Sequence, residues 1–135
     1  MAIIEWSSNL SVNVGEIDKQ HQKLIAMINE LNDAMAIGKG KDALGKIING
    51  LVTYAAGHFA TEEKYFDQFR YPATLSHKKE HSDFVRKVKE FQDGFNKGSL
   101  SLSIEIMRFL KDWLIKHIQG TDKKYGPYFN EKGLR

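Results

Sequence analysis

The spacing of apolar residues constrains this chain most, because it repeats at steps of three and four residues through four long segments. These segments span about residues 18–37, 41–69, 73–95 and 101–119. A repeat of this kind has the period of an α-helix, and no segment alternates as a β-strand would. The sequence therefore predicts an all-α protein.

Glycine and proline mark the breaks between these segments. Gly38 and Gly40 follow the first segment, Pro72 separates the second from the third, and Gly98 ends the third. Proline cannot continue a helix but starts one well. Since serine is a favoured N-cap, Ser99 or Ser101 is expected to begin the fourth helix.

Four segments of roughly 20 residues with short connections favour antiparallel neighbours. We therefore predict an up-down-up-down antiparallel four-helix bundle. An N-terminal arm of about residues 1–17 and a short C-terminal tail beyond Gly120 flank it. No repeat or composition change divides the sequence, so residues 1–135 are expected to form a single domain.

Composition removes several classes of function. The chain has no cysteine, which excludes disulfide scaffolds, thiolate nucleophiles, iron–sulfur clusters and cysteine-bound zinc. The net charge is only +3 and the charges are mixed along the chain, so we expect no nucleic-acid partner. Without a secretion signal or an apolar run of membrane-spanning length, we expect a cytoplasmic protein with no membrane insertion.

All five histidines and one glutamate lie in register with the apolar faces of the predicted helices. Any one of them alone is ordinarily a hydrogen-bonded core residue. Several on inward faces require a common explanation, because buried histidine and glutamate are costly unless paired, protonated or bound to metal. These residues are His21, His58, Glu62, His77, His81 and His117.

The turns indicate that these histidines lie at one height in the bundle. The first histidine lies about as far before the Gly38–Gly40 turn as the second lies after it. A similar symmetry across Gly98 relates the third and fourth histidines to the fifth. Because every helical residue advances by about 1.5 Å, equal counts mean equal heights. The five side chains are therefore expected to meet in one cross-section.

Two local spacings support a metal centre at that level. His58-x3-Glu62 and His77-x3-His81 are i,i+4 pairs, whose side chains share one helix face and can bind a common metal. Either pair alone is a weak signal, whereas their conjunction with the other histidines is much more specific.

His117-x4-Asp122 is a weaker spacing. Gly120 and Thr121 suggest that the helix is ending between these two residues. Asp122 is then either an ordinary loop carboxylate or a ligand that swings back toward the site.

The mixed set of imidazoles and carboxylates suits iron and disfavours calcium or magnesium, while zinc would take fewer ligands. Two octahedral ions bridged by two carboxylates and a hydroxide would leave one coordination position open. An open position beside a redox-active pair of ions implies a small molecule, with dioxygen the obvious candidate.

This arrangement of one histidine, H-x3-E, H-x3-H and H-x4-D resembles the hemerythrin family, specifically its single-domain bacteriohemerythrins. The stretches Ile17–His21 and Trp113–Ile118 are also similar to the bacterial members, and the resemblance covers essentially the whole chain. It implies an oxygen carrier rather than an enzyme, for storage, transport or delivery of dioxygen to an oxygen-requiring enzyme. It leaves the oligomeric state open.

The resemblance also divides the candidate ligands between two irons. The open position lies on the iron that has only two histidines. Two carboxylates and an oxo or hydroxo group bridge the metals. By this resemblance His77, His81 and His117 bind one iron, His21 and His58 bind the other, and Glu62 and Asp122 are the bridges.

Further residues occupy positions that surround the di-iron centre in the family. The physical reason for an apolar oxygen pocket is that it excludes water and protons; plain core packing is the alternative for its residues. Tyr125 resembles a tyrosine that supports a bridging carboxylate, and a solvent-facing tyrosine in the tail is the alternative. The expected pocket residues are Leu24, Phe59, Trp113, Leu114 and Ile118.

Three other classes of protein are alternatives. One is a di-iron oxidase, peroxidase or nitric-oxide-handling protein, but ferritin-like enzymes use Glu-x-x-His pairs that this sequence lacks. Another is an oxygen- or redox-sensing domain; the chain starts at Met1 without a recognisable signalling domain, which favours a free carrier. A metal-free structural bundle would bury five histidines to no purpose.

Overall fold

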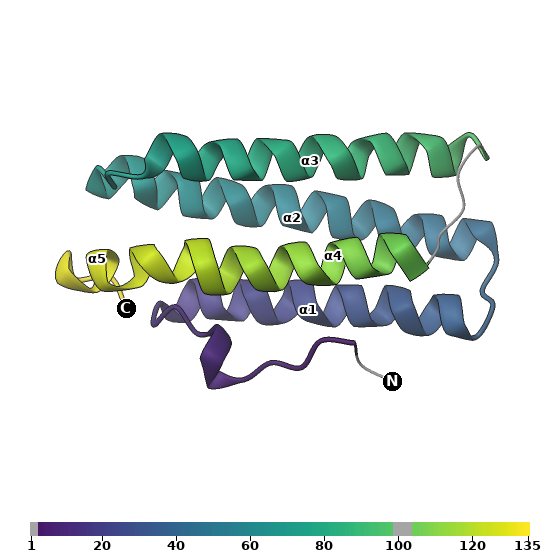
Figure 1. The fold of residues 1–135 in the computed structure, drawn as a ribbon, viewed down its shortest axis with the longest axis horizontal. Coiled ribbons are helices and arrows are strands. Elements are labelled where there is room, and N and C mark those ends of the chain that lie inside the picture. Colours follow the sequence, from purple (N-terminus) through teal and green to yellow (C-terminus); the bar gives the residue numbers. More distant parts are fainter. Residues whose placement is uncertain (1–2, 99–103) are drawn as a thin grey trace.

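The computed structural model describes the backbone of residues 3–98 and 104–135, and the side chains of 3–98 and 106–135. Four helices lie side by side in an antiparallel bundle (Figure 1): α1 (Gly15–Ala36), α2 (Lys41–Phe69), α3 (Thr74–Asn96) and α4 (Ile104–Lys116). The prediction of an all-α four-helix bundle is confirmed. Within the described ranges, none of the helices is long and apolar enough to cross a membrane.

Every helix buries one stripe of side chains, as the sequence pattern predicts. On α3, the buried residues recur at steps of three and four, which places them on a single helix face. They are His77, His81, Phe84, Val88, Phe91 and Phe95. The polar ligand candidates therefore lie on the same stripe as the hydrophobic core.

Left-handed backbone conformations end the first two helices. Gly38 adopts a φ of 74°, which glycine tolerates without steric cost. Arg70 caps α2 with a φ of 53°, and its N–H donates to the carbonyl of Phe66. These sharp turns keep the connections short and the neighbouring helices antiparallel.

The N-terminal arm is fastened along α1 by two side chains. The carboxylate of Asp18 accepts hydrogen bonds from the Ser11 hydroxyl at 2.6 Å and from the Val12 N–H at 2.8 Å. The side chain of Asn29 accepts from the N–H of Ile4 at 3.1 Å and donates to its carbonyl at 2.8 Å. The arm therefore packs as part of the fold.

The C-terminal region differs from the sequence prediction. The helical segment does not end near Gly120, and the short C-terminal tail is itself largely helical. Instead α4 continues directly as a π-helix (His117–Thr121), a 3-10 turn (Asp122–Lys124) and α5 (Tyr125–Glu131), as Figure 1 shows beyond the end of α4. Gly120 suggested a helix end in the sequence, but the wider turn of the π-helix accommodates this glycine. Packing against the rest of the bundle keeps the chain helical after Gly120.

Burial explains why this last segment stays ordered. The side chain of Phe129 on α5 is fully buried against Phe66 of α2 and Val12 and Val14 of the arm. This second apolar cluster closes one end of the bundle. The predicted caps Ser99 and Ser101 lie outside the described residues, and α1 begins at Gly15 rather than near residue 18.

Candidate metal centre

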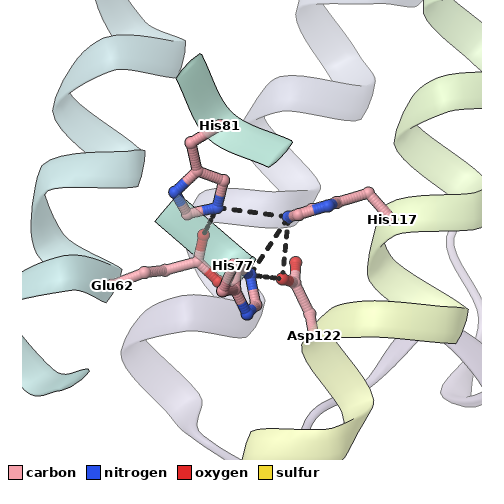
Figure 2. Close-up of side chains that lie close together, drawn as sticks. All are labelled: Glu62, His77, His81, His117 and Asp122. Atoms are coloured by element: carbon pink, nitrogen blue, oxygen red, sulfur yellow. Dashed lines mark hydrogen bonds and ion pairs between the residues drawn. The ribbon is translucent and has the colours of Figure 1, made fainter. Parts of the chain in front are cut away.

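Seven polar side chains meet inside the bundle near the end that α5 closes. They come from α1, α2, α3, the π-helix and the 3-10 turn, and none exposes more than 3% of its surface. Figure 2 shows five of them pointing toward one another between the helices. The seven are His21, His58, Glu62, His77, His81, His117 and Asp122.

The π-helix explains how His117 and Asp122 share one face. In an α-helix, residues five apart point about 140° away from each other, because each residue turns by about 100°. The i→i+5 turn of a π-helix brings such residues back into line. Asp122 Oδ1 therefore lies 3.0 Å from His117 Nε2, and Asp122 is a fully buried helical residue, so the alternative of a loop carboxylate is wrong.

Three imidazoles form one half of the cluster. The Nε2 atom of His117 lies 3.2 Å from Nε2 of both His77 and His81. Asp122 Oδ1 lies 2.7 Å from Nε2 of His77. Three ring nitrogens and a carboxylate oxygen therefore surround one point.

Two further imidazoles form the other half. His21 Nε2 lies 3.1 Å from Asp122 Oδ2, although the pair does not have the geometry of a hydrogen bond, and His58 Nε2 lies 3.1 Å from Glu62 Oε1. Glu62 Oε1 is also 3.3 Å from His81 Nε2 in the first half. Glu62 and Asp122 thus belong to both groups of potential metal ligands.

The outer nitrogens of three rings face oxygen acceptors. Because a carboxylate or amide oxygen only accepts, each Nδ1 carries a proton, and in the neutral ring Nε2 presents a lone pair to the interior. The pairs are His81 with Glu63 at 2.9 Å, His117 with Glu80 at 3.0 Å and His58 with Gln20 at 2.6 Å.

The electrostatics of the cluster keep its carboxylates ionised. Burial and Asp122 raise the pKa of Glu62, but His58 and His81 lower it more, to about 2. Burial likewise raises the pKa of Asp122, but the histidines around it, above all His117, hold it well below its usual range. Two buried negative charges therefore require a positive partner.

Without metal, protons on the histidines supply that positive charge. Burial lowers the pKa of His117, but the charges of Asp122 and Glu62 outweigh burial and raise it to about 9. The pKa of His21 is raised by the same carboxylates against the effect of its burial. A bound cation would take over the role of these protons.

Several buried atoms also lack a hydrogen-bond partner among the described residues. They are both ring nitrogens of His21, Nδ1 of His77, Glu62 Oε1 and Asp122 Oδ2. Unpaired buried polar atoms are costly, and inward lone pairs at contact distance repel one another unless a cation lies between them. The nitrogen and oxygen donors of the cluster suit a transition metal. The residues present therefore fit a metal centre.

Aromatic rings cover two of the candidate ligands. Trp113 stacks on His117 at a centroid distance of 4.4 Å, and Phe59 stacks on His81 at 4.0 Å. Among the five expected pocket residues, Trp113 is only partly buried. The other four are buried in the same apolar cluster: Leu24, Phe59, Leu114 and Ile118.

Tyr125 is fully buried and its ring stacks on His77 at a centroid distance of 5.6 Å, so the alternative of a solvent-facing tail residue is wrong. Its hydroxyl donates a short hydrogen bond to Glu62 Oε2. Burial, together with the charges of Asp122 and Glu62, raises the pKa of this phenol well above its usual value. Tyr125 is therefore a permanent donor to that carboxylate.

Sequence reasoning did not identify the acceptors Gln20, Glu63 and Glu80. Each adjoins a candidate ligand in the sequence, in Gln20-His21, Glu62-Glu63 and Glu80-His81. Adjacent helical residues point about 100° apart, so each acceptor reaches a ligand on a neighbouring helix. Polar residues next to inward-facing ligands were the signal available in the sequence.

A buried cluster of imidazoles and carboxylates shared by four helices defines a metal-binding helical-bundle protein. The family model described as the Hemerythrin HHE cation binding domain matches residues 12–129. The chain belongs to the hemerythrin family.

Known proteins are similar to this chain in sequence and in fold over most of their length. The chain is 34% identical to the bacteriohemerythrin of Methylococcus capsulatus, covering 94% of this chain and 97% of that protein. It is 36% identical to the bacteriohemerythrin of Pseudomonas aeruginosa, covering 93% and 80%. A crystal structure of wild-type hemerythrin superimposes with a TM-score of 0.89 at 34% identity, covering 93% of this chain and 97% of that one.

Proposed function

We propose that this protein binds dioxygen reversibly at a non-haem di-iron centre. The observation that carries the proposal is that two groups of buried donors share the carboxylates of Glu62 and Asp122. Two groups with shared carboxylates suit two adjacent metal ions. Membership of the hemerythrin family supports iron as the metal.

The proposed ligand assignment follows these two groups. Three histidines would hold one iron and two histidines would hold the other, with two carboxylates shared between the two groups. Iron supplies the electrons that reversible dioxygen binding requires. His77, His81 and His117 are the proposed ligands of one iron, His21 and His58 of the other, and Glu62 and Asp122 bridge them.

The remaining residues keep the site dry and fixed. Leu24, Leu114 and Ile118 present apolar surface, which excludes the water and protons that would lead to irreversible oxidation. Phe59 and Trp113 hold the rings of His81 and His117 by stacking. These contacts favour binding and release of dioxygen over its consumption.

An anaerobic titration of the metal-free protein with ferrous iron tests this proposal. Two irons per chain are expected, and exposure to dioxygen should produce a new visible absorption that argon removes. Repeated cycles should restore the same two spectra. One iron per chain, or none, would contradict a di-iron centre.

The same experiment separates a carrier from an enzyme. Steady consumption of dioxygen with release of a product would identify an oxidase and overturn the carrier proposal. We further propose that the carrier stores dioxygen in the cytoplasm or delivers it to an oxygen-requiring enzyme. Slower turnover of such an enzyme at limiting dioxygen after loss of this protein would support delivery.

A further inference from the structure

The two halves of the metal centre have different surroundings. In the three-histidine half, the outer nitrogens of His81 and His117 donate to the carboxylates of Glu63 and Glu80. In the two-histidine half, the outer nitrogen of His58 faces the neutral amide of Gln20 at 2.6 Å. Among the described residues, a carboxylate is therefore hydrogen-bonded to the outer nitrogen of a candidate ligand only in the three-histidine half.

The two carboxylates are fixed in place from separate elements. Glu80 of α3 also accepts a hydrogen bond at 2.9 Å from the hydroxyl of Thr121, the last residue of the π-helix. Glu63 lies on α2, beside the ligand Glu62, and crosses to His81 on α3. The side chains of Glu63 and Glu80 are 31% and 44% exposed, so their hydrogen bonds link buried rings to the surface.

The acceptor in the other half is held differently. The amide nitrogen of Gln20 donates to the Thr61 hydroxyl at 3.4 Å, which turns its carbonyl oxygen toward His58. Nδ1 of His21 has no hydrogen-bond partner among the described residues. In the described part of the chain, no carboxylate is therefore hydrogen-bonded to an outer nitrogen of this half.

We propose that Glu63 and Glu80 are positioning residues that make the three-histidine half the tighter metal site, which fills first. A carboxylate that accepts the outer N–H of an imidazole fixes its orientation and makes the inner nitrogen a better donor. The inference rests on the proposed function only in requiring two metal ions. The two halves differ both in these hydrogen-bonded carboxylates and in their number of histidines. Substitutions must therefore separate the effects of the two differences on metal affinity.

Calorimetric titration of the metal-free protein with Co²⁺ tests this inference, because it does not depend on iron oxidation or dioxygen. Glu63→Gln and Glu80→Gln keep an acceptor oxygen but remove the charge. Each should weaken the tighter binding step by about tenfold to a hundredfold and leave the weaker step unchanged. Glu90→Gln is the matched control, because Glu90 is an exposed acid on α3 that lies in the same groove as Glu63.

Two further variants assign the steps to the halves. Gln20→Glu places a carboxylate behind His58 and should tighten the weaker step. His58→Ala removes a ligand of the two-histidine half and should abolish the weaker step while the tighter one persists. Circular dichroism of each variant checks that the helices are intact.

Unchanged affinities in Glu63→Gln and Glu80→Gln, or an equal loss in both steps, would overturn the inference. Loss of the tighter step in His58→Ala would also overturn it, because the two-histidine half would then fill first. Failure of the proposed function has a different signature. The cobalt steps would behave as described, yet the iron-loaded wild-type protein would not bind dioxygen reversibly.

Discussion

At the scale of single residues, Glu62 depends on a hydroxyl that lies more than sixty positions away in the sequence. Tyr125→Phe removes the hydrogen bond to Glu62 Oε2 and leaves that oxygen without its donor. The affinity for the two metal ions that Glu62 is proposed to bridge should fall by about tenfold, since losing a donor to a buried charged group costs about 1–3 kcal/mol. Calorimetric titration with Co²⁺ measures this change.

Tyr128→Phe is the matched control for that variant. Tyr128 also donates its hydroxyl, to the carbonyls of Phe69 and Arg70, but it contacts none of the seven clustered side chains. Its loss should lower stability without changing metal affinity. Equal metal affinity in both variants would show that Tyr125 does not support Glu62.

The apolar residues beside the cluster make a different prediction. Leu114→Asn replaces a buried aliphatic side chain by a polar one of similar size, which admits water near the metal. The lifetime of the oxygenated absorption should shorten by about tenfold or more, equivalent to about 1.4 kcal/mol of barrier. Leu51→Asn, at a buried position of the same apolar cluster on α2, should destabilise the protein yet leave that lifetime unchanged.

How much of the site could be predicted depended on which physical signal each residue carries. His77 and His81 were predictable as inward-facing because they continue a stripe that includes Phe84 and Val88. Glu80 carries no such signal, because it is partly exposed and looks like an ordinary surface acid until His117 is placed beside it. Ligands follow from periodicity, whereas adjacency to a ligand only makes a residue such as Glu80 a candidate outer partner, and the contacts between helices decide which ring it meets.

At the scale of elements, the π-helix was the part of the fold that periodicity could not reveal. A spacing of five between His117 and Asp122 fits neither helical step of three or four, and Gly120 suggested a helix end. The wider turn is stabilised from outside, by Thr121 on Glu80 and by the burial of Ile118. Tertiary contacts therefore override the local preference of the chain.

The contact of α5 with the arm provides a prediction at this scale. A Cβ atom at Gly126 would lie 2.5 Å from the carbonyl oxygen of Val12, so Gly126→Ala must displace α5 or the arm. The free energy of unfolding should fall by about 1–3 kcal/mol, as in other overpacked sites. Urea unfolding of the metal-loaded protein measures this value.

Gly57→Ala is the matched control, because a Cβ at this position of α2 meets nothing within 4 Å. Alanine should raise the free energy of unfolding by about 0.5–1 kcal/mol, since glycine in a helix loses more conformational entropy. Stabilisation by both substitutions would mean that α5 does not pack closely against the arm.

At the scale of the whole molecule, the candidate metal centre links every long helix of the bundle. The apolar core runs along α1 to α4 and holds the helices together, while the cluster joins α1, α2, α3 and the extension of α4 at one level. Without metal, this level contains unpaired polar atoms and two buried carboxylates. The bundle is therefore expected to fold without metal but to be less stable.

Removal of the metal tests this expectation. Each ion that binds only the folded state, present at a hundred times its dissociation constant, adds about 2.7 kcal/mol of stability. For a domain of this size, each kcal/mol raises Tm by roughly 2–8 °C, so the iron-loaded protein should melt about 10 °C or more above the chelated one. Differential scanning calorimetry under argon measures both transitions.

Adding Mg²⁺ to the chelated protein is the control and should not raise Tm, because magnesium prefers oxygen ligands and five of the seven candidate ligands are imidazoles. Equal Tm values with and without iron would show that the cluster is stable without metal.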